Sequence, residues 1–384
     1  MRSEFLKSLG VVMNGATIPK SIGEYPAYGG NGIVQYVGES NYKKNTIAIG
    51  RVGAQCGSVY FCENDCWITD NCLAFIVNEE NNPYYIYYLL KMINLNHFHI
   101  GSAQPLITQT IINNLQYGCV LDKEEQNKVA NFLRKIDNKL RLNNRTINTL
   151  ESMAKTLYDY WFVQFDFPDA NGKPYKTSGG KMEWNETLSR EIPAGWEVDN
   201  LFRIASYVNG LACQKYRPQG NEESLPVIKI REMHEGVRPD TERVSANIPL
   251  DNVICDGDIL FSWSATLEIQ YWTGGKAGLN QHIFKVIPIK DYPKEYVYHQ
   301  LKDYIVNFVK IAEARKTTMG HITQDHLNFS RIAIPSNDVL KQFEKRLKPI
   351  HKQIVKYNQE NRKLNYLRDF LLPMLMNGQV TFQQ

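Results

Sequence analysis

Apolar residues recur every three or four positions along two long stretches of the chain, and this spacing predicts two long helices. The first stretch covers residues 122–165 and the second covers residues 337–384. Both carry the same register over several turns, as expected for the seam of a coiled coil. The predicted seam residues are Leu133, Ile136, Leu140, Leu150, Leu157, Leu347, Ile350, Ile354, Leu364 and Leu371.

Neither helix can bury its apolar stripe alone, and the nearest candidate partner is the other helix. At ~1.5 Å per residue, each helix reaches roughly 60 Å. If the two halves of the chain are related by a pseudo-two-fold axis, the helix pair must be antiparallel. Asn144 and Asn358 are then expected within the seam, where a polar residue fixes the register. The alternative is two unrelated core helices.

Short motifs that precede the first helix return before the second. Asn14-Gly15 returns as Asn209-Gly210, and Ile107-Thr108-Gln109 returns as Ile322-Thr323-Gln324. Such internal similarity indicates two homologous halves, each a globular domain followed by a helix. We therefore predict an α+β protein with two pseudo-symmetric globular domains joined by an antiparallel coiled coil of two long helices. The predicted segments are a first domain at 1–121, a helix at 122–165, a linker at 166–196, a second domain at 197–336 and a helix at 337–384.

Each domain is predicted to be a small, loop-rich sheet with one or two helices. Short apolar runs between Gly- and Asn-rich turns predict strands at 47–52, 73–77, 258–261 and 282–286. Amphipathic stretches that open after a proline predict helices at 83–94 and 294–311. Residues 166–196 hold several prolines and glycines and few apolar residues, which predicts a linker with turns and no packed element.

Composition narrows the class of protein. The 384 residues are 43% apolar, which is ordinary for globular cores, and the net charge of +4 permits an anionic partner without demanding one. No stretch approaches the ~18 uninterrupted apolar residues of a membrane span. Seven cysteines, an odd number, do not resemble a secreted disulfide framework. We therefore expect a cytoplasmic protein with no membrane partner.

Several of these motifs resemble those of a known family. Residues 25–33 and 49–57 are similar to the opening of a target recognition domain in the specificity subunit of type I restriction-modification enzymes. Residues 193–197 and 257–262 resemble the entry and central motifs of such a domain in the second half. The order domain, helix, domain, helix is also the family's order, and the resemblance covers essentially the whole chain.

The resemblance implies a subunit that reads double-stranded DNA and has no catalysis of its own. Each target recognition domain would read one half of a bipartite, asymmetric site, and the helices would hold the halves apart. Two methyltransferase subunits would dock on the helices, with restriction subunits in the full complex, to methylate adenine or cleave DNA. S-adenosylmethionine, ATP and Mg would belong to those partners, with no cofactor bound by this chain.

Specific reading needs Arg or Lys against guanine and Asn or Gln against adenine, with basic and polar groups on the phosphates. Arg51 and Arg231 are the strongest candidates, because both lie beside predicted strand-to-loop junctions. The loop candidates are Tyr28, Asn31, Lys43, Lys44, Arg51, Gln55, Gln104 and Gln109 in the first half, and Lys229, Arg231, His234, Arg238, Arg243, Trp263, Gln281, Lys316 and His321 in the second.

Two other classes of function remain open at this stage: a catalytic DNA methyltransferase or nuclease-like protein, and a coiled-coil interaction protein without a DNA role. Four cysteines between Cys56 and Cys72 invite a zinc site, but their spacing contains no Cys-x-x-Cys pair, which favours small buried residues. Asn82-Pro83-Tyr84-Tyr85 resembles the motif with which amino-methyltransferases hold a target amine, but helix entry is the better account. We predict no catalytic residues and no metal site.

Overall fold

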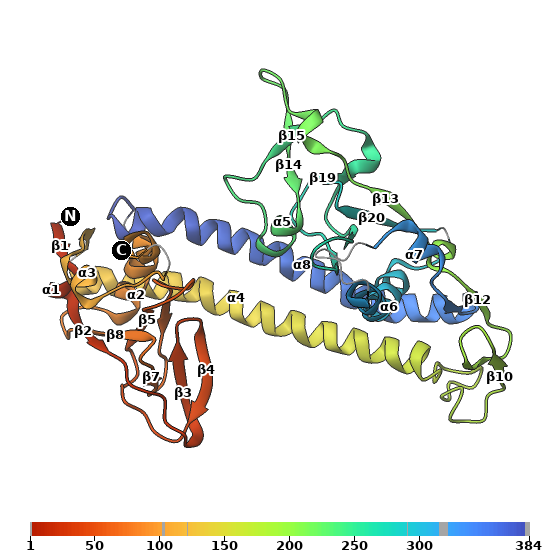
Figure 1. The fold of residues 1–384 in the computed structure, drawn as a ribbon, viewed down its shortest axis with the longest axis horizontal. Helices are drawn as coiled ribbons and strands as arrows, with labels where there is room; N and C mark the ends of the chain where they lie inside the picture. The colour runs from red at the N-terminus through yellow and green to blue at the C-terminus, as the bar shows by residue number, and fades with distance from the viewer. Residues whose placement is uncertain (1, 102–103, 121, 290, 315–321, 381–384) are drawn as a thin grey trace. The chain divides into compact units, whose positions relative to one another are not determined.

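The computed structural model describes residues 2–101, 104–120, 122–289, 291–314 and 322–380. The chain divides into two compact units, one made of residues 1–141 with 363–384 and one of residues 142–362. A search of the described residues finds no helix with the length and apolar character of a transmembrane segment. Figure 1 shows the mixed helix-and-sheet fold that the sequence predicts.

The first unit is built on two small sheets. One is fully antiparallel and the other contains a parallel pair, β3 with β7. The strands of the first sheet are, in spatial order, β2 (Gly10–Asn14), β8 (Cys72–Val77), β5 (Ile47–Gly50) and β6 (Val59–Phe61). The strands of the second are β4 (Gly32–Val37), β3 (Ile22–Gly29) and β7 (Trp67–Ile68).

Both faces of the central strand β5 are buried, which explains why its sequence is apolar without a break. Ile47 and Ile49 pack into the core beneath helix α2 (Pro83–Ile93). Ala48, between them, packs on the opposite face with Tyr28 and Cys62. This alternation is the two-residue period of a strand. The sheet is therefore covered by α2 on one side and by the second small sheet on the other.

Helix α2 begins where its sequence predicts. The side chain of Asn82 accepts a hydrogen bond from the Tyr85 N–H at 3.1 Å, and Pro83 occupies the first helical position, where a missing N–H costs nothing. Asn82 is thus a helix cap, as expected. The remaining elements of the unit are β1 (Arg2–Phe5), α1 (Leu6–Leu9), a 3-10 turn (Leu95–Phe98), α3 (Gln109–Asn114) and β9 (Gln116–Cys119), with β1 antiparallel to β9.

The second unit repeats the topology of the first, with one additional short strand, β16, in its second sheet. Its first sheet is β13 (Ala205–Asn209), β20 (Ile283–Pro288), β17 (Ile259–Ser262) and β18 (Glu268–Tyr271). Its second is β15 (Arg243–Ser245), β14 (Ser224–Ile228), β19 (Ala277–Leu279) and β16 (Val253–Ile254), with β14 parallel to β19. β12 (Glu197–Asp199) is antiparallel to β21 (Ile332–Ile334), as β1 is to β9. The duplicated motifs therefore reflect a duplicated fold.

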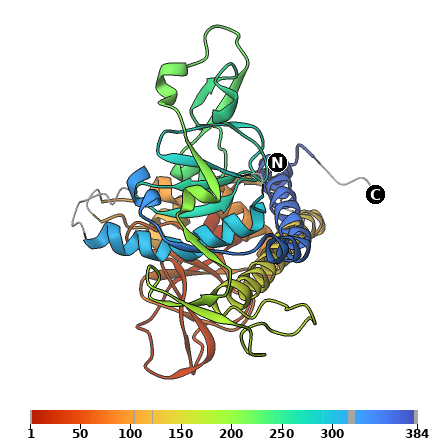
Figure 2. The same cartoon turned by 90° about the vertical axis from the view of Figure 1, so that its right-hand side faces the viewer.

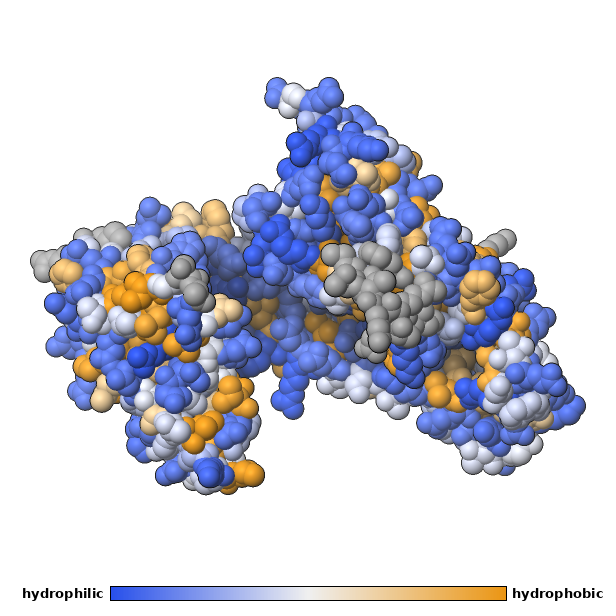
Figure 3. All heavy atoms as spheres, viewed as in Figure 1, coloured by the Kyte–Doolittle hydropathy of each residue, from blue (hydrophilic) through white to orange (hydrophobic). Residues whose placement is uncertain are grey.

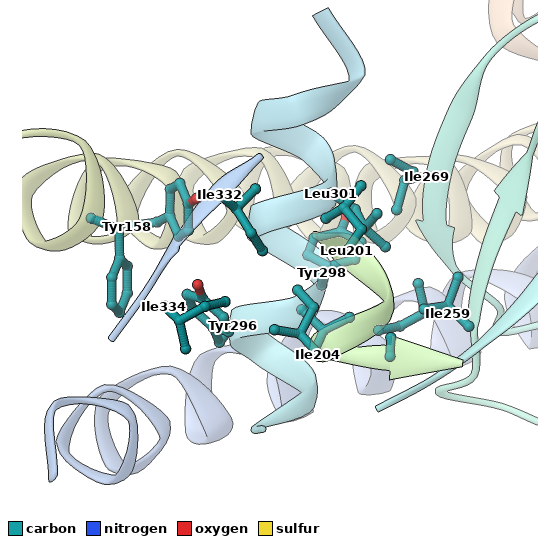
Figure 4. Close-up of a cluster of buried hydrophobic side chains, with 14 of the residues drawn as sticks. Tyr158, Leu201, Ile204, Ile259, Ile269, Tyr296, Tyr298, Leu301, Ile332 and Ile334 are labelled. Atoms are coloured by element: carbon teal, nitrogen blue, oxygen red, sulfur yellow. The ribbon is translucent and has the colours of Figure 1, made fainter. Parts of the chain in front are cut away.

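Helix α6 (Lys294–Ala314) takes the place of α2 and forms the centre of the largest core. Figure 4 shows Tyr296 of this helix beside Ile334 of β21, and Leu301 beside Leu201. Short turns complete the unit, namely 3-10 turns at Leu201–Arg203, Cys213–Tyr216 and Leu250–Asn252, and helices α5 (Ile230–Glu235) and α7 (Gln324–Asn328).

The two units differ most where β3 and β14 end. β3 turns directly into β4, whereas helix α5 stands between β14 and β15. Apolar atoms gather over the β3–β4 hairpin (Figure 3), where Ile33 and Val34 are exposed. Strands β14 and β15, green in Figures 1 and 2, lie at the end of the second unit farther from helix α8 (Asn337–Met376).

Helices α4 (Lys123–Tyr158) and α8 are the predicted long helices, and they run antiparallel within each unit. In the first unit, Arg368 forms an ion pair with Asp137 at 3.1 Å. In the second, Phe343 packs against Trp161, which lies in the π-helical turn (Asp159–Val163) that follows α4. Every predicted seam residue is buried or half-buried, and Leu133 and Leu347 are fully buried. The antiparallel pairing is confirmed.

The seam asparagines are not those predicted. Asn143 and Asn361 are buried, whereas Asn144 is exposed and Asn358 is only half-buried. The exposed Asn144 accepts a hydrogen bond from Asn361 at 2.8 Å. The prediction was wrong by one position in α4 and three in α8, because it assumed that the gap in the apolar pattern marks the centre of the seam.

The prediction of an unpacked linker at 166–196 was also wrong. The segment contains a hairpin of β10 (Met182–Asn185) and β11 (Arg190–Pro193). Phe167 stacks on Trp196 with ring centroids 5.3 Å apart, and both join the core of the second unit. Asp166 accepts hydrogen bonds from the Thr177 N–H and hydroxyl at 2.8 and 2.6 Å. The aromatic residues of this segment pack it against the core, although most of its other residues favour turns.

Candidate nucleic-acid interface

In each unit we call the first sheet, which contains β5 or β17, the main sheet. Four loops of the first unit converge at one end of its main sheet. Arg51, the first residue after β5, donates its N–H to the carbonyl of Asn71 at 2.9 Å and accepts from the Ile107 N–H at 2.9 Å. Gly53 donates to the carbonyl of Pro105 at 3.1 Å. The turn at Gly30 lies against the same group, since a Cβ at Gly50 would come within 3.0 Å of the Gly30 carbonyl oxygen. We call this group of loops, residues 29–31, 51–58, 69–71 and 104–108, the loop end of the unit.

Four candidates from the first half lie on this loop end. Asn31, Gln55 and Gln104 are exposed, and Arg51 is half-buried. Gln109 is close to them, as the first residue of α3 after its Thr108 cap. Asn71 is exposed on the same loops and was missed, because nothing in the sequence shows that residues 69–71 meet the loop after β5.

The side chain of Arg51 has an unusual environment. Its Nε lies out of contact with solvent and has no hydrogen-bond acceptor among the residues that the structure describes. Its carbonyl accepts from the Cys56 thiol at 3.2 Å as well as from Ile107. A buried N–H without a partner lowers the stability of the folded state by about 1–3 kcal/mol. The backbone hydrogen bonds and the packing around Arg51 must offset this cost.

The second unit has the same loop end. Trp263, the first residue after β17, donates its N–H to the carbonyl of His282 at 3.3 Å and accepts from the Ile322 N–H at 2.9 Å. The candidate Gln281 is half-buried beside this contact. His282 is exposed, with its ring centroid 5.5 Å from that of Trp263, and was missed for the same reason as Asn71.

Most of the basic candidates that the structure describes in the second half pair with neighbouring acids. Arg231 forms ion pairs with Glu232 at 2.7 Å and Asp240 at 2.9 Å, and its hydrogen bond lowers the pKa of Asp240. Lys229 pairs with Glu242 at 2.7 Å. These pairs organise α5 and the segment before β15, so their cations are less available to phosphate than the sequence suggested. The remaining contacts are His234 with Glu268 at 3.2 Å, Arg238 with Glu235 at 3.4 Å and Arg243 with Ser224 at 2.7 Å.

Other candidates lie elsewhere. Tyr28 is buried in the core with Cys62, and burial raises the pKa of its hydroxyl well above the usual range, so we remove it from the candidate set. Lys43 and Lys44 precede β5 and thus lie at the opposite end of this strand from Arg51, with Lys43 paired to Asp65 at 2.9 Å. Lys316 and His321 lie outside the described residues.

One glycine in each unit marks the shared architecture of the loop ends. A Cβ on Gly15, which follows β2, would collide with the carbonyl of Thr69. A Cβ on Gly210, which follows β13, would collide with the carbonyl of Asn280. The repeated Asn-Gly pair is therefore a site of close backbone approach, where only glycine fits.

Cysteines and histidines of the first unit serve structural roles. Cys62, Cys66 and Cys72 are buried together in one core, as small apolar residues. Among the described residues, no three His, Cys, Asp or Glu side chains are grouped as metal ligands would be. His99 contacts the carbonyl of Asn96 through Nδ1 at 2.6 Å.

Comparisons with known proteins agree with this architecture. Residues 5–152 match the family described as type I restriction modification DNA specificity domain. The chain is 24% identical to the type I restriction enzyme HindI specificity subunit of Haemophilus influenzae, over 88% of this chain and 87% of that one. It is 21% identical to the MjaIX specificity subunit of Methanocaldococcus jannaschii, over 78% of this chain and 69% of that one.

A solved structure shares the fold. The crystal structure of a type I restriction-modification system S subunit from M. genitalium superposes with a TM-score of 0.63, covering 98% of this chain and 96% of that one at 17% identity. Its likeness concerns the fold alone. Residues 5–152 thus match the DNA specificity domain family, and the chain as a whole is similar in sequence to specificity subunits of type I restriction enzymes.

Proposed function

We propose that this chain reads one bipartite, asymmetric DNA site, with one half-site at each loop end. The observation that carries the proposal is that two loop ends share one backbone design but present different side chains. Arg51 in the first unit occupies the place that Trp263 occupies in the second. Two loop ends with the same backbone arrangement and different side chains suit two half-sites of different sequence.

The chemistry of the first loop end fits base reading. Asn and Gln side chains can pair with the edge of adenine, and an Arg fork can pair with guanine, both in the major groove. Asn31, Gln55, Asn71 and Gln104 supply exposed amides there. Loops anchored on a rigid sheet hold such groups in position for binding.

Partner subunits would supply catalysis. We propose that two methyltransferase subunits dock on the long helices, that restriction subunits join the full complex, and that S-adenosylmethionine, ATP and Mg are used by those partners. The proposed products are methylated adenine or cleaved DNA. Because the proposed substrate is the cell's own or incoming DNA, we place the complex in the cytoplasm.

The test uses the full complex and a random DNA library. The proposal expects enrichment of two short, different sequences with a fixed gap, and binding that weakens steeply as salt rises. A complex that binds without sequence preference would contradict it. The chain alone should transfer no methyl group to DNA, so measurable transfer without added subunits would favour the catalytic alternative.

A further inference from the structure

Arg51 and Trp263 occupy the same position in the two duplicated folds. Each is the residue that follows the central strand of its main sheet, β5 or β17. Each donates its N–H to the loop that precedes the neighbouring strand, at Asn71 or His282. Each accepts a hydrogen bond at 2.9 Å from the isoleucine that precedes a capping threonine, Ile107 or Ile322.

The backbone at both positions is therefore fixed from two sides, and only the side chain differs. Arg51 carries a guanidinium whose Nε has no acceptor within the described part of the protein. The residue is half-buried, so part of its side chain remains accessible to a ligand. Guanine offers two acceptors, O6 and N7, that match the fork of an arginine.

Trp263 offers different chemistry at the equivalent place. Its ring lies against Phe284 of β20 at 5.9 Å and against the exposed His282 at 5.5 Å. The residue is only half-buried, so part of the indole remains on the loop surface. An apolar ring suits the methyl group of thymine, which a guanidinium does not.

We propose that Arg51 and Trp263 are corresponding specificity-determining residues, one for each half-site. Arg51 reads a guanine in one half-site, and Trp263 makes an apolar contact with a thymine methyl in the other. The inference rests on the proposed function. Trp263, and not the basic candidate Arg231, is the counterpart of Arg51, since Arg231 lies in α5, which has no equivalent in the first unit.

The test measures the base preference of the complex, assembled with its partner subunits, on a library in which each half-site position is varied. Arg51→Ala should lose at least about tenfold of the preference for guanine at one base pair of one half-site. The other half-site and the gap should stay unchanged. Arg51→Gln should shift that position toward adenine, because an amide pairs with adenine. Trp263→Ala should alter only the other half-site.

Two control variants lie at the opposite ends of β2 and β13 from the loops. Lys7→Ala and Arg203→Ala remove exposed cations there and should leave every base preference unchanged. If Arg51→Ala unfolds, Arg51→Gln keeps most of the side chain and still tests the reading. Variants that fold and leave both half-sites unchanged, or that weaken both equally, would overturn the assignment. A wild-type complex without a bipartite preference would instead refute the proposed function.

Discussion

The Asn143 Nδ2 of α4 donates a hydrogen bond of 2.9 Å to the Asn361 Oδ1 of α8, and both side chains are buried between the helices. Asn143 also donates to Glu360 at 3.0 Å. A buried polar pair in an apolar seam is satisfied in only one alignment of the two helices. The pair therefore fixes how far α4 and α8 slide along each other.

The first prediction concerns this pair. Asn143→Leu should destabilise the protein by about 1–3 kcal/mol, because the buried side-chain oxygen of Asn361 loses the donor that Asn143 supplies. Asn143→Leu combined with Asn361→Leu should recover most of the loss, since two apolar side chains suit the seam. Urea unfolding of the full chain measures both. If the double variant were less stable than the single one, the contacts of these two residues with Glu360 and Asn144 would matter more than the contact between them.

The second prediction concerns the length of the helices. Seven residues inserted after Asn144, with seven inserted at the matching point of α8 after Glu360, keep the apolar face in register. The insertion adds ~10 Å, equivalent to about three base pairs. The gap between half-sites should lengthen while the bases read stay the same. Altered bases, or an unchanged gap, would show that the helices do not set the spacing. Insertion into α4 alone is the control, and it should destabilise the helix pair.

The third prediction concerns the two equivalent glycines. Gly15→Ala and Gly210→Ala should each destabilise the protein, because the new methyl group meets a backbone carbonyl that cannot move without the strand. Gly30→Ala is the matched control, since its methyl group would lie 3.5 Å from the nearest carbonyl oxygen, an ordinary contact. Thermal unfolding separates the three variants. Equal stability of all three would argue against close approach at Gly15 and Gly210.

The fourth prediction concerns pH. The ring Nε2 atoms of His299 and His351 lie 2.9 Å apart in the core of the second unit. Burial, followed by the nearby His351, Lys302 and Lys155, lowers the pKa of His299 to about 2, and burial with Lys302 lowers the pKa of His351 to about 4. The unfolded chain protonates both near pH 6.5, so stability should fall as the pH drops from about 6.5 toward 4.

Urea unfolding at pH 7.5 and pH 5 measures this loss, which is at most about 1.4 kcal/mol per pH unit for each imidazole. The variant His299→Leu with His351→Leu should lose less stability over the same interval. A wild-type protein as stable at pH 5 as at pH 7.5 would show that the pair is hydrated or already protonated.

The long helices and the buried strands could be predicted from the sequence, because their apolar residues follow the period of the element. The heptad spacing located α4 and α8, and uninterrupted apolar runs located β5 and β8. The prediction from the sequence failed where a few long-range contacts decide the structure. Stacking of Phe167 on Trp196 orders a segment that its prolines and glycines mark as a linker.

The candidate site was predicted only in part. Asn31, Gln55 and Gln104 lie on the loop end as exposed residues, but the buried Tyr28 does not. Arg51 and Arg231 were the strongest candidates on local strand signals alone. The equivalence of Arg51 and Trp263 depends on hydrogen bonds to residues at least 19 positions away, which no local pattern records.

The central claim is that this one chain specifies a site made of two different half-sequences. Mapping methylated adenines across the genome of a cell that carries the full system, with and without this chain, tests it most directly. The account predicts one bipartite motif with two unlike halves and a constant gap, and its complete disappearance when the chain is removed. Methylation that persists without the chain, or a motif that is contiguous or symmetric, would contradict it.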